Sequence, residues 1–285
     1  MNSSNDMNQF SIEKARSGTK EFFESNSLVA KVAFLLLILI VFVILLRLCV
    51  SIITWYYTPG GNPHFLDGMQ QANQMRRFIQ NPNEVGSKTI VRSRNEDAGI
   101  EFTWSVWVYI DDISSGSGKY RHIFHKGDNP SHIDSTGMVY PNNAPGLYLA
   151  PNTNSLYVVM NTFHDYNEEI MVPNIPVQKW VNVIIRCKNT TLDVYVNGVI
   201  SQSITLTGVP KQNYGDVWLC ANGGFSGFVS NLWYYDHALG ASDIASLNQK
   251  GPNRTMVGQT GMEHKKPDYL SLRWYFFGNE NMYNP

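Results

Sequence analysis

The sequence has little charge and no excess of either sign. Its 285 residues carry 22 basic and 23 acidic side chains, a formal net charge of -1, and charged residues make up only 16% of the chain. A nucleic-acid-binding surface needs basic residues that neutralise phosphates. The charge balance therefore argues against a nucleic-acid partner.

Cysteine is also scarce, with only Cys49, Cys187 and Cys220 in the chain. Cys49 lies just after the longest hydrophobic run, in a stretch that is still mostly apolar, which leaves Cys187 and Cys220 for the rest of the protein. Sequence alone cannot show whether two thiols meet, so one disulfide and two free thiols stay open as alternatives.

Polar residues are missing from Val32 to Leu46, the longest hydrophobic run. At about 1.5 Å per helical residue this run covers roughly 22 Å, less than a hydrocarbon core of about 30 Å. The apolar pattern resumes after Arg47, so we expect a transmembrane helix with its interfacial flank over residues 30–57. Long basic side chains and aromatic rings suit the lipid headgroup region. The residues expected at this membrane interface are Arg47, Trp55, Tyr56 and Tyr57.

A cleaved signal peptide and a buried core helix are the alternatives to an anchor. The leader of about thirty residues contains acidic side chains and is followed by no small-residue cleavage pattern, unlike a signal peptide. A core helix is rarely apolar on every face for this length. The sequence thus favours a retained single-pass anchor in a lipid bilayer.

Basic residues near the expected span suggest an orientation. The leader contains Lys14, Arg16, Lys20 and Lys31, whereas the downstream flank has almost none before Arg76 and Arg77. The positive-inside tendency then places the N-terminus in the cytoplasm and the larger downstream part on the opposite side.

Outside the anchor, the pattern changes along the chain. Residues 1–29 form a polar tail, and residues 58–86 are expected to be a linker with a short helix. Residues 87–250 alternate short β-like runs with turns. The expected first strand is 89–92, and apolar residues alternate over 101–110.

The 251–285 extension is too apolar for a plain disordered end, so we expect it to pack on this domain or on a partner.

The turns support an all-β domain. Asn197-Gly198 separates two β-like runs, and this dipeptide favours a two-residue hairpin because both positions need positive φ. Many short strands with such turns are typical of an antiparallel sandwich or barrel.

The order of these segments resembles the laminin-G-like, concanavalin-A-like lectin/glucanase family. The resemblance covers about residues 87–250 and is carried by FTWSVWVYI, HIFHKGD, QKWVNVIIRC, TLDVYVNGVI and GFSGFVSNLWYYDHAL. It implies a two-sheet antiparallel jelly-roll sandwich. It does not imply one function, because related folds include lectins, glucanases and interaction modules.

Catalytic residues of the glucanase type are not recognisable. Glucanases of this superfamily place two carboxylates on one strand in an E-x-D-x-x-E pattern, which this sequence lacks. Glu168 and Glu169 are adjacent and are expected to point to opposite faces of a strand. His122 and His125 should likewise point apart, which argues against a shared metal site. We therefore expect a protein that is not an enzyme.

Calcium is the cofactor that the resemblance suggests, since many relatives bind it with loop oxygen ligands. The candidate ligands are Asp128, Asn129 and Asp134 in the GDNPSHIDSTG loop. The alternative is that these side chains bond their own backbone in turns.

Sugar binding would use an exposed aromatic ring for stacking and amide groups for the hydroxyls. Trp107 and Tyr109 are candidate rings, and Asn222 and Gly223 lie in a loop able to form a rim. The sequence thus favours a membrane-anchored binding module with a glycan or protein partner. A structural component of a membrane-associated assembly, such as a membrane or capsid layer of a large virus, is the alternative. A divergent glycoside hydrolase is the weaker one.

Overall fold

A computed structural model describes residues 28–57, 60–97, 99–114 and 118–257. The chain divides into two compact units, Met1–Thr58 and Pro59–Pro285. The predicted polar tail at 1–29 lies almost wholly outside the described residues.

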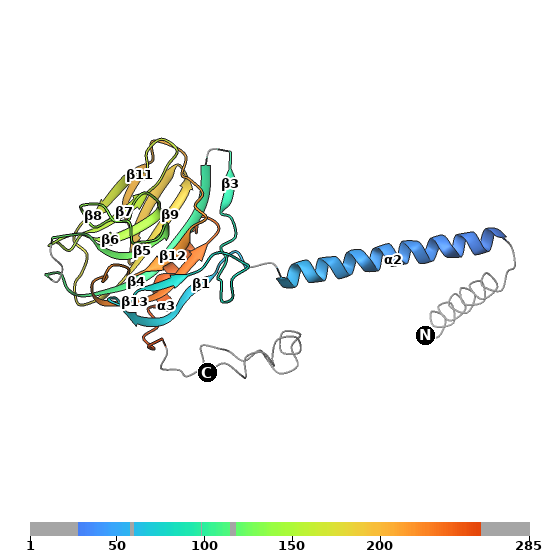
Figure 1. Ribbon diagram of the computed structural model, residues 1–285, viewed down its shortest axis with the longest axis horizontal. Coiled ribbons are helices and arrows are strands. Elements are labelled where there is room, and N and C mark those ends of the chain that lie inside the picture. The colour runs from blue at the N-terminus through green and yellow to red at the C-terminus, as the bar shows by residue number, and fades with distance from the viewer. Residues whose placement is uncertain (1–27, 58–59, 98, 115–117, 258–285) are drawn as a thin grey trace, which may run out of the picture. The chain divides into compact units, whose positions relative to one another are not determined.

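The first unit contains the helix α2 (Leu28–Tyr57), shown in blue in Figure 1. It is long and apolar enough to cross a membrane, and no part of its most apolar window is buried against the protein. At about 1.5 Å per residue it extends roughly 45 Å, more than a hydrocarbon core. Arg47 lies within the helix, and Trp55 and Tyr56 are exposed near its end. Tyr57 is the last residue of the helix.

The second unit is a sandwich of two antiparallel sheets, as the sequence predicts (Figure 1). Within the described residues, sheet I contains β1 (His64–Gln71), β3 (Arg94–Glu96), β4 (Gly99–Asp112), β9 (Trp180–Asn189), β10 (Thr191–Val196), β11 (Val199–Thr205) and β13 (Ser226–Tyr235). Sheet II contains β2 (Arg76–Phe78), β5 (Arg121–Gly127), β6 (Asn143–Leu149), β7 (Leu156–Met160), β8 (Glu168–Val172) and β12 (Asp216–Leu219). Sheet I has the order β1-β13-β4-β9-β10-β11 with β3 paired to β4, and sheet II has the order β2-β12-β5-β6-β7-β8.

The hydrophobic core fills the space between the sheets. Along β4, Trp104, Val106 and Val108 point inward to this core. Their partners across the sandwich include Phe124 from β5 and Leu147 from β6. Because successive strand residues face opposite sides, the period of two in the sequence selects this inner face.

The β10–β11 hairpin has the predicted turn. Asn197 has φ 52° and Gly198 has φ 81°, and Val196 pairs with Val199 across them. Positive φ at both positions is the geometry that matches the twist of two paired strands. This local prediction is confirmed.

The structure differs from the expectation for residues 58–86. Instead of a linker with a helix, β1 pairs with β13 and β2 pairs with β12, so the sandwich begins at His64. The expected strand at 89–92 is also wrong, because the strand in this region is Arg94–Glu96. Register shifts within β1 interrupt its alternation of apolar residues. Because of this interruption, the apolar residues Leu66 and Met69 are three residues apart, a spacing that on its own suggests a helix.

The outer face of sheet I is partly covered by the helix α3 (Ala241–Lys250), where Ile244 packs against Leu239 and against Ile184 of β9. Beyond it, Met256 forms a bridge with Met69 of β1, so the start of the predicted 251–285 extension packs on the sandwich. The aromatic part of that extension lies outside the described residues. Cys187 and Cys220 are both buried and free, which excludes the disulfide alternative.

Candidate functional site

A cleft of about 630 Å³ opens where several loops meet the start of β13. We call it the loop cleft. Its lining residues are Gln71, Asn73, Asp111, Lys119, Tyr120, Arg121, His122, Ile133, Gly137 and the segment 222–228.

The β12–β13 loop is held against the β1–β2 connection. At Gly224, where φ is 51°, the backbone N–H donates to Ala221 O at 2.9 Å. A Cβ at this position would lie 1.8 Å from Ala72 O, so only glycine fits. Asn222 donates from Nδ2 to Pro130 O at 3.0 Å, which ties the loop to the segment after β5. These contacts fix the shape of one wall.

The lining combines amides, rings and charges. Gln71, Asn73 and Asp111 are exposed polar groups, and Tyr120 and Phe228 are half-buried rings beside them. Amide and carboxylate groups bond hydroxyls, and rings stack on apolar faces. This mixture suits a polar ligand with apolar faces.

Arg121 lies buried beneath the cleft. Its Nη2 donates to Ala150 O at 2.8 Å, and its Nη1 donates to Asp112 O at 3.4 Å. Burial lowers the pKa of this guanidinium from its usual value, and Asp112 partly offsets the effect. Arg121 thus brings positive charge to the floor of the cleft, close to the exposed Lys119.

The two histidines of β5 are in contact, contrary to the sequence prediction. His122 Nε2 and His125 Nδ1 are 2.6 Å apart. In the pairing of β5 with β6, His122 faces Tyr148 and Phe124 faces the next residue, Leu147, so Ile123 is an extra residue. Such a bulge shifts the alternation by one residue. It therefore places both imidazoles on the same face of sheet II.

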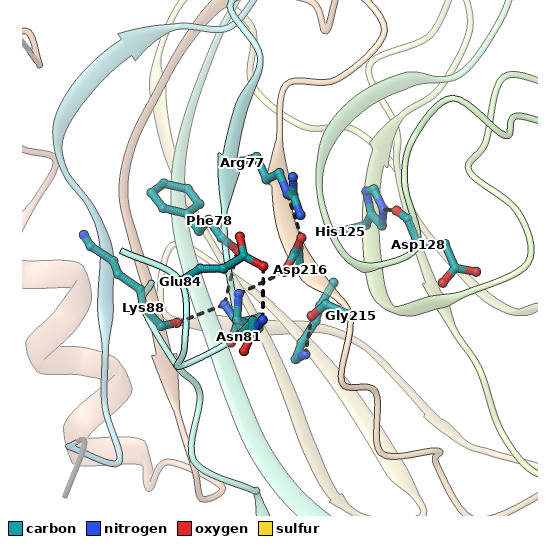
Figure 2. A network of polar contacts seen from close by, with 11 residues as sticks. Arg77, Phe78, Asn81, Glu84, Lys88, His125, Asp128, Gly215 and Asp216 are labelled. Atoms are coloured by element: carbon teal, nitrogen blue, oxygen red, sulfur yellow. Dashed lines mark hydrogen bonds and ion pairs between the residues drawn. The ribbon is translucent and has the colours of Figure 1, made fainter. Parts of the chain in front are cut away.

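All four ring nitrogens of this pair have partners. His122 Nδ1 accepts from the backbone N–H of Ala221 at 3.0 Å, so the proton of the neutral ring is on Nε2 and is donated to His125. His125 Nε2 then donates to Asp128 O at 2.9 Å (Figure 2). Burial, together with His125, holds the pKa of His122 well below 6.5, and burial lowers the pKa of His125 to about 4. Both rings are neutral, and the pair holds Ala221, the residue directly before the segment 222–228 that lines the cleft.

The four predicted ligand residues are not brought together. Asn222 and Gly223 line the loop cleft, but Trp107 and Tyr109 do not. Trp107 is buried, and Tyr109 packs beside Trp180 at a ring separation of 5.6 Å. Their position follows from the strand period, since the even-numbered residues of β4 face the core and the odd-numbered residues face the outer side of sheet I.

Two of the three candidate calcium ligands, Asn129 and Asp134, accept hydrogen bonds within their own turns, and Asp128 accepts one from a more distant segment. Asp134 accepts hydrogen bonds from the backbone N–H groups of Thr136 and Met138, at 2.9 and 3.0 Å. Asn129 accepts from the N–H of Ser131. Asp128 accepts from the side chain of Asn142. In the part of the chain that the structure describes, no three His, Cys, Asp or Glu side chains form a group suited to a metal. Calcium stays an untested prediction for these residues.

Glu168 and Glu169 face opposite sides of β8, as predicted. Glu168 is buried and accepts from Thr162 Oγ1, Thr207 Oγ1 and the N–H of Thr207, whereas Glu169 is exposed. Glu168 thus joins loops within the fold and does not face the loop cleft.

Sequence reasoning missed most of the cleft. Gln71, Asn73, Asp111, Lys119 and Arg121 come from three separate segments, and no spacing between them signals a common site. One part of the cleft could be recognised from the sequence. Asn222, Gly223 and Gly224 form a turn with positive φ, and this residue combination indicates a loop.

Residues 64–245 match the family described as the concanavalin A-like lectin/glucanases superfamily, of the laminin-G type. The chain belongs to this family. The match begins at the first residue of β1, which agrees with the boundary of the sandwich.

Solved structures with a similar fold include the receptor-binding domain of a botulinum neurotoxin C/D mosaic serotype, at 14% identity, a TM-score of 0.41, and coverage of 53% of this chain and 36% of that one. The binding domain of botulinum neurotoxin serotype G has 13% identity, a TM-score of 0.44, and coverage of 64% and 46%. A sialidase of Trypanosoma rangeli has 17% identity, a TM-score of 0.38, and coverage of 52% and 22%. The chain thus spans half or less of these structures, and likeness at this level says nothing about ligand or activity. No curated protein matches the chain.

Proposed function

We propose that the protein is a membrane-anchored, non-catalytic recognition module whose loop cleft binds glycans or glycoproteins. The observation that carries this proposal is the composition of the cleft, where exposed amides and one carboxylate lie beside the rings of Tyr120 and Phe228. Hydroxyl-rich ligands with apolar ring faces need this combination.

Binding is favoured over hydrolysis because of the acid–base groups that line the cleft. Among the described residues of the lining, Asp111 is the one carboxylate. Glycosidases of the usual kind need two, one acting as an acid and the other as a nucleophile or base. This supports a cleft that holds a glycan without cleaving it.

The helix α2 supplies the anchor in this proposal. Its exposed side chains are apolar along most of its length, and its flanking charge favours a cytoplasmic N-terminus with the sandwich on the opposite side. Protease added outside sealed cell-derived vesicles of cytoplasmic-side-in orientation should then digest the sandwich. Protection of the sandwich would contradict the orientation.

A glycan array probed with the full chain in lipid nanodiscs tests the proposed function. We expect a selective set of bound glycans, with affinity falling about tenfold in Asn73→Ala, a loss of about 1.4 kcal/mol. Asn73 is exposed and lines the cleft, so its loss should not disturb the fold. Asn83→Ala is the matched control, because Asn83 is an exposed asparagine outside the cleft.

Two results would contradict the proposal. Wild-type chain that binds no glycan and co-purifies in a stable membrane assembly would favour the structural role. Release of reducing sugar from a bound glycan, abolished by Asp111→Asn, would indicate a hydrolase.

A further inference from the structure

A second cleft of about 370 Å³ lies at one open end of the sandwich, between the two sheets. It shares no lining residue with the loop cleft. Its apolar wall consists of core side chains of sheet I, among them Phe102 and Trp104 of β4 and Tyr234 of β13. The volume is within the usual range for small-molecule pockets, about 300–1,000 Å³. We call it the intersheet cleft.

One charged side chain points into this apolar space. Lys126 is at the end of β5, opposite Val217 of β12, and Val217 belongs to the core between the sheets. The strand alternation therefore places the Lys126 side chain on the inner face of sheet II, and only 7% of the residue is exposed. A lysine is rarely buried to this extent unless it is paired.

The hydrogen bonds of Lys126 are incomplete in the part of the chain that the structure describes. Its Nζ donates to Gly215 O at 2.7 Å, whereas an ammonium has three donors. Asp216, the adjacent carboxylate, is occupied by other donors: Oδ2 accepts from Arg77 Nε at 2.6 Å, and Oδ1 accepts from the N–H of Gln80 at 2.9 Å. Figure 2 shows Asp216 facing Arg77, with Gly215 next to it.

Other cations line the same cleft. Arg92 and Lys211 contribute to its rim, and Asp216 is the one carboxylate among its described lining residues. The balance of charge around the opening is therefore positive. An anion entering here would gain the free donors of Lys126 while its apolar part covers the side chains of the wall.

We propose that the intersheet cleft binds an amphipathic organic anion, with an apolar body against Phe102, Trp104 and Tyr234 and a carboxylate on the ammonium of Lys126. This site is independent of the glycan-binding proposal. It would allow the sandwich to hold a small carboxylate at one end and a glycan in its loops.

Hydrogen bonds hold the loop at 79–93 in place, which supports a cleft that exists before a ligand binds. The side chain of Gln80 donates to Lys88 O at 2.9 Å and accepts from the N–H of Ile90 at 2.9 Å. Gln212 also donates to Ser93, which connects this loop to the opposite rim. A pocket whose walls are already held by hydrogen bonds loses less conformational entropy when it binds a ligand.

The test uses 2-naphthoate as probe and the full chain in phosphatidylcholine nanodiscs, with isothermal titration calorimetry and empty nanodiscs as blank. We expect saturable 1:1 binding that weakens at least tenfold in Lys126→Met, a variant that keeps an apolar stem in place of the lysine. Neutral 2-naphthalenemethanol should bind more weakly to the wild type and be unaffected by the substitution. Lys179→Met, at an exposed lysine outside the cleft, should bind 2-naphthoate as the wild type does.

If Lys126→Met does not fold, the pH dependence of 2-naphthoate binding to the wild type tests the role of the lysine. Burial lowers the pKa of Lys126 to about 8, and Asp216 partly offsets this shift. Because the anion needs the charged ammonium, the affinity for 2-naphthoate should fall as the pH rises above about 8, well before exposed lysines titrate. Absence of saturable binding, affinity that is constant up to pH 9.5, or equal affinity in folded Lys126→Met would overturn the proposal.

Discussion

The two buried histidines of β5 connect the wall of the loop cleft to the stability of the sandwich. His122 accepts from the backbone of Ala221, and His125 donates to the backbone of Asp128. A proton added to His122 Nδ1 would turn this nitrogen into a donor that faces the backbone N–H of Ala221, so the hydrogen bond between them would be lost. Protonation is therefore coupled to the loss of a contact that holds the cleft.

The first prediction concerns acid pH. Burial lowers the pKa of His125 from 6.5 to about 4 in the folded chain, and burial together with His125 holds the pKa of His122 well below 6.5. The unfolded chain therefore binds more protons below pH 6.5, so this contribution to stability is complete above pH 6.5 and is lost as the pH falls towards 4. We expect the free energy of unfolding to fall by on the order of 1 kcal/mol per pH unit for each histidine between pH 6.5 and 5. Denaturant unfolding at a series of pH values measures it.

The double variant His122→Gln/His125→Gln serves as the comparison. Glutamine does not titrate, so its slope between pH 6.5 and 5 should be much smaller, even if its stability at pH 7.5 is lower. His132→Gln is the control, because His132 is exposed and its removal should leave the slope unchanged. Equal slopes in the wild type and the double variant would show that the pair does not control acid stability.

At the scale of strands, the sequence predicts regular strands and turns, but it does not predict β-bulges. The regular alternation of β4 and the Asn197-Gly198 turn are local signals, and both lead directly to the observed elements. In β5 the extra residue Ile123 brings His122 and His125 to the same face of the sheet, where residue spacing predicts opposite faces. A bulge depends on the partner strand, so residue spacing within one strand does not reveal it.

The same reason explains the missed strand and the missed cleft. β1 is stabilised by pairing with β13, far along the chain, and its register shifts remove the period of two. The loop cleft likewise depends on contacts across the fold, such as Gly224 against Ala72. Its loop at 222–224 was recognisable, but its charged floor at Arg121 was not, because burial of an arginine is set by tertiary packing.

The second prediction concerns the helix α3, which covers sheet I through one fully buried side chain. Ile244 packs against Ile184 and Leu239, and it is the buried residue of this helix. Ile244→Ala should lower the free energy of unfolding by roughly 2–4 kcal/mol through lost burial and the cavity left behind. Hydrogen exchange should show faster opening of α3 than of the core strands.

The control for this prediction is Gln249→Ala in the same helix. Gln249 is exposed, so its removal should change the stability by no more than about 0.5 kcal/mol. If Ile244→Ala were equally harmless, α3 would not depend on this contact.

For the molecule as a whole, the two units differ in whether their apolar side chains are buried or exposed. The sandwich buries its apolar side chains between two sheets, whereas α2 exposes leucine, isoleucine, valine and phenylalanine around its full circumference. Soluble monomers rarely expose an apolar surface of this extent. The sequence alone predicts this contrast, because it depends on composition and not on tertiary contacts.

The last prediction follows from that exposed surface: the full chain should stay in the membrane pellet after an alkaline carbonate wash. Leu36, Leu39 and Phe42 are exposed near the middle of the apolar part of α2. An arginine at the centre of a transmembrane helix costs about 2.5–3.5 kcal/mol on insertion scales, so Leu36→Arg/Leu39→Arg/Phe42→Arg should fail to insert and move to the supernatant. The matched control Leu36→Ala/Leu39→Ala/Phe42→Ala removes the same side chains without adding charge and should stay in the pellet. Wild-type chain released by carbonate would show that α2 binds another protein and not the hydrocarbon core, and the anchored recognition module would then have to be replaced by a subunit of a soluble assembly.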